Sequence, residues 1–198
     1  MQKNKQLFEK LVSAVCALAL LSGFTTIVQT SRQKVVPTAV EIVASDKKEA
    51  LKRDKRSSRA KVIDGLRGHR DQLTDRQLID LLDAVGFRGN GLRTAWAVAK
   101  RESNGRPRAH NQNKATGDNS YGMFQINMIG ELGEARRDKF NLDSSRQLFD
   151  PVTNAMLVFR MTKGGADWSA WDIGKMAYNN GKNEPKYLEW LSKYPEKY

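Results

Sequence analysis

The chain has 198 residues, of which 34 are lysine or arginine and 22 are aspartate or glutamate, and its net charge is +12. This length allows one ordinary domain with appendages, and the charge predicts attraction to polyanions such as nucleic acid, anionic lipid or acidic wall polymers. The single cysteine, Cys16, excludes a disulfide framework and a cysteine-based zinc site. His69 and His110 lack metal-ligand spacing, so we expect no metal and no cofactor.

The first thirty residues have the layout of an export signal. Three lysines within the first ten residues precede an uncharged stretch over 11–30, whose apolar centre lies at 15–21. This stretch is also long enough to cross a bilayer, and no clean Ala-x-Ala cleavage site follows it, so a membrane anchor stays open beside a cleaved signal peptide. A buried core helix is a third interpretation, although no polar face occurs at helical spacing. The first two interpretations predict an exported protein of the periplasm, the cell envelope or the medium.

Residues 31–72 are expected to form a basic, flexible linker. The part over 45–62 holds eight lysines or arginines against three acids and almost no large apolar residue, so it cannot bury a core. It predicts a solvated linker or a charged helix, whose charge would allow contact with an anionic polymer. Nucleic acid is a disfavoured partner, because no aromatic residues are interleaved for stacking on bases.

From Leu73 onward, apolar residues recur at helical spacing, which predicts a mainly α-helical domain over 73–198. Thr74 is expected to cap a helix over 75–85, and a second helix is expected over 92–103. Turn and capping signals predict the rest. In chain order these elements are a polar loop over 104–119, a strand or turn over 121–127, a helix from Asp150–Pro151 to Gly164–Gly165, a helix from a Ser169–Asp172 capping box to Asn180–Gly181, and a last helix over 186–194.

Glu102 is the candidate catalytic residue. It lies at the C-terminal end of an apolar helix, where the helix dipole disfavours a negative charge. Partial burial would disfavour the charge further. Both effects raise the pKa of the carboxyl group, and a carboxyl group that is protonated near neutral pH can act as a general acid. The alternative interpretation is a solvated glutamate at a helix end.

Four short motifs along the chain carry a family resemblance. They are a helix ending in Glu-Ser, a Ser-x-Gly-x-x-Gln-Ile segment, an Asp-Pro-x-x-Asn helix start and an Ala-Tyr-Asn-x-Gly segment, which stand at Glu102–Ser103, Ser120–Ile126, Asp150–Asn154 and Ala177–Gly181. Over about residues 75–185 the chain resembles the soluble lytic transglycosylase and goose-type lysozyme superfamily. The sequence from Met123 to Gly133 is similar to that of lysozyme-like domains of phage tail proteins, which would imply a virion-associated protein.

The resemblance implies a lysozyme-like fold with a loop-rich lobe, and peptidoglycan as the partner. Glu102 would donate a proton to the β-1,4 glycosidic oxygen between N-acetylmuramic acid and N-acetylglucosamine. In a lytic transglycosylase the same group then helps the muramoyl 6-hydroxyl to attack the anomeric carbon. The resemblance also implies a saccharide site that includes Ser103, Ser120, Gln125, Tyr178 and Asn179. Helix-end solvation of Ser103, a turn role of Ser120 and core packing of Tyr178 are the alternatives.

Asp118 distinguishes two chemistries. Hydrolysis with inversion requires a second carboxylate that activates water, and Asp118 is the candidate nearest to the Ser-Tyr-Gly segment. We favour a turn role for it in Gly117–Asp118–Asn119, and therefore a transglycosylase over a hydrolytic lysozyme. Two further classes stay open, which are a non-catalytic wall-binding protein and a virion-associated protein that binds the wall or DNA through 45–62.

Overall fold

The computed structural model describes residues 39–113, 115–173 and 184–196. The chain divides into two units, residues 1–43 and 44–198, and the folded elements belong to the second unit apart from the first residues of its first helix. The expected signal or anchor over 1–30 lies outside the described residues. Within the described ranges, no helix combines the length and the apolar character needed to span a membrane.

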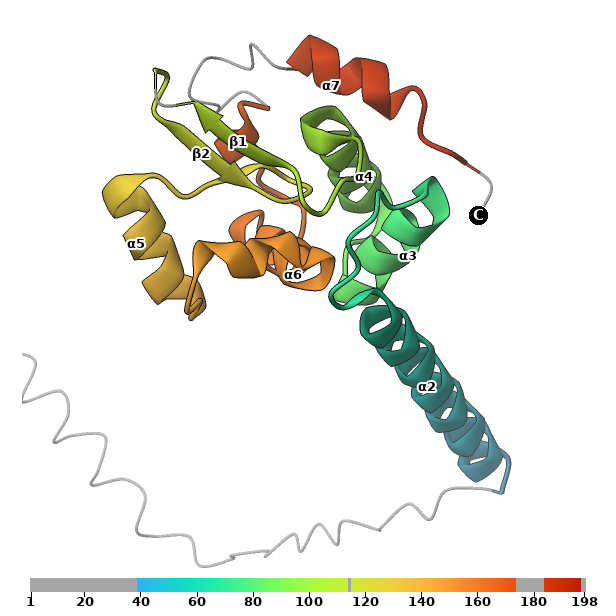
Figure 1. The fold of residues 1–198 in the computed structure, drawn as a ribbon. Helices are drawn as coiled ribbons and strands as arrows, with labels where there is room; N and C mark the ends of the chain where they lie inside the picture. The colour runs from blue at the N-terminus through green and yellow to red at the C-terminus, as the bar shows by residue number, and fades with distance from the viewer. Residues whose placement is uncertain (1–38, 114, 174–183, 197–198) are drawn as a thin grey trace, which may run out of the picture. The chain divides into compact units, whose positions relative to one another are not determined.

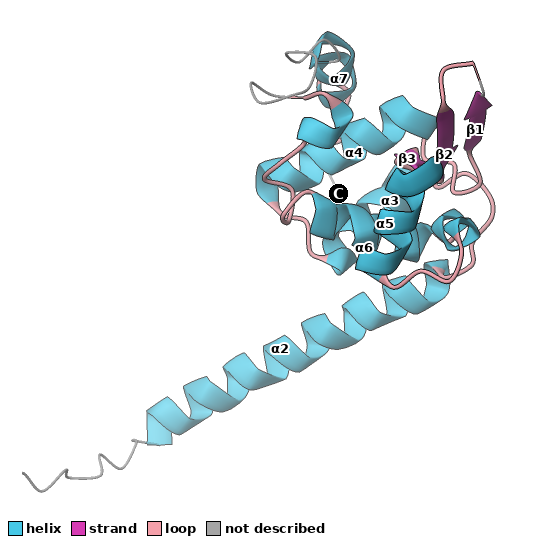
Figure 2. Cartoon of the chain, turned by 90° about the vertical axis from the view of Figure 1, so that its left-hand side faces the viewer, coloured by secondary structure: helices cyan, strands magenta, loops and turns pink. Residues whose placement is uncertain are grey.

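The described part of the chain is mainly helical, as predicted, and carries one small sheet (Figures 1 and 2). The helices are α2 (Ala39–Leu66), α3 (Asp75–Val85), α4 (Gly89–Ser103), α5 (Gly130–Phe140), α6 (Pro151–Met161) and α7 (Glu184–Leu191), with two 3-10 helices, η1 (Ser145–Phe149) and η2 (Ser169–Trp171). The antiparallel strands are β1 (His110–Asn113), β2 (Asp118–Tyr121) and β3 (Ile126–Asn127), in the order β1-β2-β3.

Helix α3 leads into α4, and the candidate acid lies at the end of α4. Thr74 caps α3, as predicted, and the structure shows that it does so in a complete capping box with Gln77. Helix α4 begins at Gly89, three residues earlier than predicted, and ends where Asn104 adopts the left-handed conformation with φ of 55°. Its middle section, Ala95–Ala99, is buried. The end of α4 is therefore held by the core behind it.

The core joins the helices to the turn between β2 and β3. Trp96 of α4 is 1% exposed, and the turn residues Met123 and Phe124 are both 0% exposed. Trp171 donates its indole N–H to the carbonyl oxygen of Phe124 at 2.8 Å. Since hydrogen-bonded and tightly packed groups have little freedom to move, this turn is fixed relative to the end of α4.

Asn154, the last residue of the Asp-Pro-x-x-Asn motif, is the polar hub of this arrangement. It is 0% exposed, and its amide N–H group donates to the carbonyl oxygens of Tyr121 at 3.2 Å and Leu148 at 3.0 Å. Its side-chain oxygen accepts from the backbone N–H of Phe124 at 3.1 Å. A Cβ atom on Gly122 would lie 2.3 Å from the Asn154 amide nitrogen, so only glycine fits there. The motif therefore builds the turn that follows β2.

Several elements differ from the prediction. Residues 104–119 are not all loop, because β1 pairs with β2 from Asp118 onward. The Ser169–Asp172 capping box is wrong, because the Ser169 hydroxyl donates to Asp167 at 2.7 Å and Asp172, with φ of 56°, ends the short helix η2. The rest of that predicted helix, up to Asn180–Gly181, lies outside the described residues. Helix α5 was not predicted, because its sequence has no apolar stripe and buries little besides Gly133.

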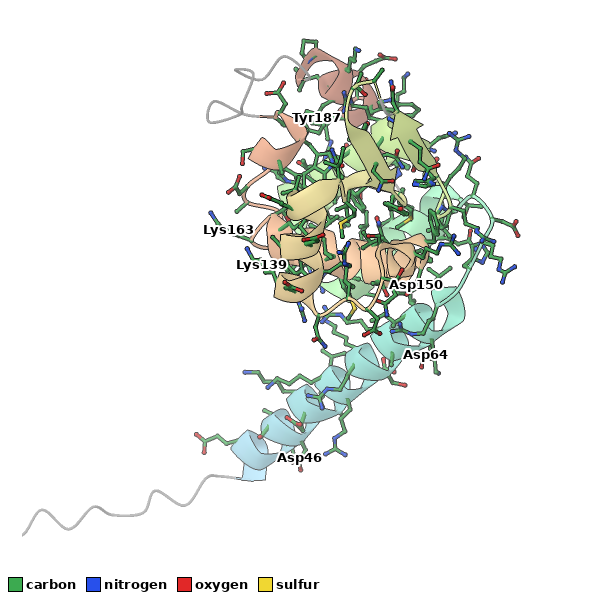
Figure 3. The ribbon with its side chains drawn as sticks, turned by 60° about the vertical axis from the view of Figure 1, so that its left-hand side comes forward. Asp46, Asp64, Lys139, Asp150, Lys163 and Tyr187 are labelled. Carbon is green, nitrogen blue, oxygen red and sulfur yellow. The ribbon has the colours of Figure 1, made fainter. Side chains whose placement is uncertain are left out.

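Helix α2 carries the basic stretch over 45–62, and side chains from 43 to 61 are exposed (Figure 3). Its last turns are different, since Val62, Ile63 and Leu66 pack against the core. Just beyond them, the backbone N–H of Gly68 donates to Asp150 at 2.8 Å. The packed part of the chain therefore begins within α2, earlier than the change in composition suggested.

Candidate active site

Glu102 is the penultimate residue of α4, and its side chain is 19% exposed. Its carboxylate forms an ion pair with the neighbouring Arg101, whose side chain is buried to a similar degree. Burial raises the pKa of Glu102 above its ordinary value, and the negative charge of Asp118 raises it further, whereas the charge and hydrogen bond of Arg101 lower it. The net direction is upward, which favours the protonated form that a general acid requires.

Two cavities meet at Glu102, and Gln125 lines both of them. The smaller one has a volume of about 260 Å³ and is lined by Arg101, Glu102, Gln125, Ile126, Asn127, Arg136, Met161, Ala170, Trp171 and Asp172. The larger one has a volume of about 690 Å³ and is lined by Arg70, Asp71, Gln72, Glu102, Arg106, Arg108, Ala109, His110, Asn111 and Gln125. Because they share two side chains, the cavities form one cleft that passes the Glu102 carboxylate.

Gln125 lies in the cleft beside Glu102. Its φ of 49° is unusual for a residue other than glycine, and its amide N–H group donates to the carbonyl oxygens of Gly122 at 2.9 Å and Ala109 at 3.2 Å. The amide oxygen accepts no hydrogen bond from the described residues, so it is the atom that can accept one from a ligand. Because the amide N–H group donates to two backbone carbonyl oxygens, the side chain of Gln125 is held in place.

Asp118 lies at the start of β2, where it pairs with Asn113, and not in a turn as predicted. Its carboxylate accepts hydrogen bonds at 2.5 Å from the Ser120 hydroxyl and from the Asn111 side chain. It is close enough for its charge to act on Glu102, yet it lines neither of the two cavities. These hydrogen bonds indicate a structural role for Asp118, which holds β1 and β2 together.

Ser103 and Ser120 also lie next to the cleft without lining it. The buried Ser103 hydroxyl donates to the carbonyl oxygen of Met123 at 2.8 Å and accepts from the backbone N–H of Arg106 at 3.1 Å. The Ser120 hydroxyl is committed to Asp118. Both serines therefore contact protein groups around the site. Tyr178 and Asn179 lie outside the described residues.

Several side chains of the cleft were not anticipated from the sequence. Arg101 directly precedes Glu102 in the sequence. Its proximity to the acid could therefore have been predicted, although the motifs did not include it. Arg136 comes from the unpredicted helix α5 and donates to the backbone carbonyl of Asn127. Asp172 adds a second carboxylate to the smaller cavity. Residues that only the fold brings together leave no spacing pattern in the sequence.

The structure combines a mainly helical domain, a small antiparallel sheet and a cleft at the end of a core helix. These features fit the lysozyme-like class of proteins. Residues 80–173 match the family described as lysozyme-like domain, and the chain belongs to the lysozyme-like superfamily. The resemblance inferred from the four motifs is thus confirmed at superfamily level. The assignments as transglycosylase, goose-type or phage-tail domain stay predictions.

Among curated proteins, the chain is similar to "Lysozyme C, milk isozyme" of Equus caballus, with 31% identity over 93 residues that cover 43% of this chain and 72% of the relative. It is also similar to "Lysozyme C" of Equus asinus, with 33% identity over 95 residues and the same shares of the two chains. No solved structure matches significantly. The range matched by the family, 80–173, includes Glu102 and Gln125.

Proposed function

We propose that this protein cleaves the β-1,4 bond between N-acetylmuramic acid and N-acetylglucosamine in peptidoglycan, with Glu102 as general acid. The observation that carries the proposal is the position of Glu102, a largely buried carboxyl group with a raised pKa in the wall of a cleft. Membership of the lysozyme-like superfamily supports the same class of reaction. An intact acid in such a cleft argues against a protein that only binds the wall.

In the proposed reaction, Glu102 transfers its proton to the glycosidic oxygen as the bond from that oxygen to the anomeric carbon of the muramoyl residue breaks. The neighbouring Arg101 guanidinium orients the carboxyl group, and after the proton has left it forms an ion pair with the carboxylate and stabilises it. The amide oxygen of Gln125 is placed to accept a hydrogen bond from a sugar hydroxyl or acetamido N–H group. These contacts fix the scissile bond relative to the acid.

We favour a lytic transglycosylase, in which the muramoyl 6-hydroxyl attacks the anomeric carbon and Glu102 accepts its proton. The nucleophile then belongs to the substrate, so no second carboxylate is required. Asp118 supports this route, since its two oxygens are engaged by Ser120 and Asn111. A hydrolytic lysozyme is the second candidate, and the observation that favours it is the presence of Asp172 in the same cavity as Glu102.

Mass spectrometry of the products tests both the proposed cleavage and the choice between transglycosylase and hydrolase. The full chain is incubated with purified peptidoglycan, and the released fragments are weighed. New 1,6-anhydro muramoyl ends are expected, whereas reducing muramoyl ends, which are one water heavier, would show hydrolysis instead. A chain that creates no new glycan ends would reject the proposed activity.

Peptidoglycan lies outside the cytoplasm, so the proposed activity requires export or delivery from a virion. We propose that residues 1–30 provide export, as a cleaved signal peptide or as an anchor, and that the chain from residue 31 to the end of the exposed part of α2 at residue 61 connects them to the enzyme domain. Sequencing the N-terminus of the mature protein tests this. A mature chain in the cell envelope that starts near residue 30 indicates cleavage, a full-length one in the membrane indicates an anchor, and a cytoplasmic chain contradicts export.

A further inference from the structure

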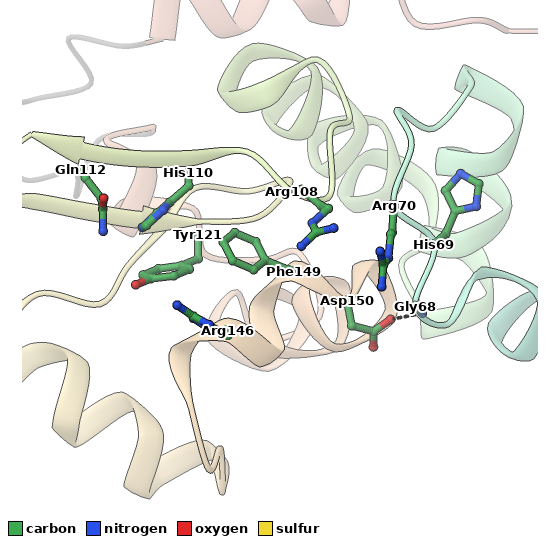
Figure 4. A pocket seen from close by; sticks show the side chains of 10 residues that line it. All are labelled: Gly68, His69, Arg70, Arg108, His110, Gln112, Tyr121, Arg146, Phe149 and Asp150. Carbon is green, nitrogen blue, oxygen red and sulfur yellow. Dashed lines mark hydrogen bonds between the residues drawn. The ribbon is translucent and has the colours of Figure 1, made fainter.

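A third cavity, of about 670 Å³, adjoins the cleft on the side of the sheet (Figure 4). Three arginines line it, which come from three different segments, namely the link between α2 and α3 (Arg70), the loop before β1 (Arg108) and helix η1 (Arg146). Arg70 and Arg108 also line the larger cavity beside Glu102. The third cavity is therefore a continuation of the cleft that passes the candidate acid.

The three arginines of this cavity have no acidic partner among the described residues. Within the described part of the chain, Arg70, Arg108 and Arg146 form neither ion pairs nor side-chain hydrogen bonds. Asp150 is the one acid among the lining residues. Its oxygens already accept from the backbone N–H of Gly68 at 2.8 Å and from the Thr153 hydroxyl at 2.7 Å. Three guanidinium groups therefore remain available to an anion.

The same cavity also has an aromatic floor. The rings of His110 and Tyr121 lie 4.2 Å apart between centroids, and Phe149 lies 5.3 Å from Tyr121 and 5.6 Å from His110. Figure 4 shows Phe149 among the guanidinium groups of the three arginines. A ligand that suits this surface combines anionic groups with short hydrocarbon segments, because arginine pairs with carboxylates in a two-pronged geometry and aromatic rings contact carbon.

We propose that this cavity binds the carboxylates of the peptide stem that the glycan strand carries. The proposal rests on the proposed function, since the lactyl group of muramic acid joins the peptide to the polymer that Glu102 would cut. Because the two cavities are continuous, the anionic group bound in this cavity would belong to the same glycan strand that lies in the cleft. An amino-acid carboxylate on an aliphatic backbone matches both the arginines and the aromatic floor better than a phosphate alone.

Binding to the full chain that carries Glu102→Gln tests the proposal without turnover. Calorimetry compares two tetrasaccharide fragments of the same glycan, one with peptide stems and one from which an amidase has removed them. We expect the peptide-bearing fragment to bind about tenfold more tightly, as one or two charge-assisted hydrogen bonds would provide. Adding Arg146→Gln should reduce this ratio to about twofold or less.

A matched control removes two positive charges elsewhere. Lys139→Gln with Arg160→Gln changes exposed residues that line none of these three cavities, and it should leave the affinity ratio unchanged, because the proposed contact is made by the arginines of the cavity.

Equal affinities for the two fragments, or a ratio that does not depend on Arg146, overturn the proposal. Arg146-dependent binding of a phosphate-bearing wall polymer without peptide, in place of the peptide-bearing fragment, also overturns it. A wild-type chain that keeps this ratio but leaves peptidoglycan uncut would reject the cleavage and not the recognition of the peptide.

Discussion

At the scale of single residues, the site depends on the protonation of one carboxyl group with two charged neighbours. Arg101 lowers the pKa of Glu102 and Asp118 raises it, while burial sets the net direction upward. An acid must be protonated before it can donate, so the rate falls as the pH rises through its pKa. The two neighbours should therefore control the alkaline limb of activity in opposite senses.

Arg101→Gln should shift the alkaline limb of kcat/KM to higher pH, because a charge that favours the carboxylate is removed. Asp118→Asn should shift it to lower pH, because a like charge that disfavours the carboxylate is removed. The pH profiles of both variants and of the wild type are measured on the same glycan strands. Shifts in the same direction, or none in either variant, would contradict the assignment of Glu102 as the acid.

Asp118→Asn also separates the two chemistries by the size of its effect on kcat at the optimal pH. For a transglycosylase the loss should be about tenfold or less, since only hydrogen bonds that order the strands are weakened. For an inverting hydrolase in which Asp118 activates water, the loss should be on the order of a hundredfold or more. A large loss together with reducing-end products would show that the transglycosylase route is wrong.

At the scale of elements, Asn154 is expected to carry an unusual share of the stability. Asn154→Ala leaves three buried backbone groups, on Tyr121, Phe124 and Leu148, without their partner. We expect the free energy of unfolding to fall by about 3 kcal/mol, measured by urea denaturation. Asn90→Ala changes an exposed asparagine and serves as the control. An Asn154 variant as stable as this control would contradict the role of the hub.

The end of α2 gives a second prediction at this scale. A chain that lacks residues 1–60 keeps Leu66 and the Gly68–Asp150 hydrogen bond, and it should fold like the full chain. A chain that lacks residues 1–72 loses both, and it should be less stable by about 3 kcal/mol. Thermal unfolding followed by circular dichroism compares the two. Equal stability would place the start of the domain at the composition break near Leu73.

The elements that could be predicted are those whose signals are local. Thr74 with Gln77 and Asp150 with Pro151 mark helix starts in the sequence itself, and both helices begin there. The predicted helix at Ser169 failed because Asp167 competes for the serine hydroxyl and Asp172 takes a left-handed conformation. Glu102 and Gln125 could be found from motifs, whereas the arginines of the cleft come from segments that only the tertiary fold brings together.

At the scale of the whole molecule, positive charge is concentrated on α2 and in the extension of the cleft. The net charge is +12, exposed side chains of α2 carry the basic stretch over 45–62, and arginines line the extension of the cleft. We propose that α2 draws the enzyme to acidic wall polymers, while the cleft selects the bond. Such attraction between exposed charges weakens with salt, unlike the chemistry at Glu102.

The central claim is that the carboxyl group of Glu102 cuts the glycan strand. Glu102→Gln should keep the fold at neutral pH. Its raised pKa means that the folded state favours the protonated form, so the stability that this group contributes falls as the pH rises through that pKa, and an amide avoids the loss.

The most direct measurement is the rate at which purified peptidoglycan releases glycan fragments, for the wild type, Glu102→Gln and the exposed control Glu131→Gln. Loss of a general acid should lower the rate of the Glu102 variant by about a hundredfold or more, while the control cuts like the wild type. A folded Glu102→Gln protein that releases fragments at more than about a tenth of the wild-type rate would contradict the claim.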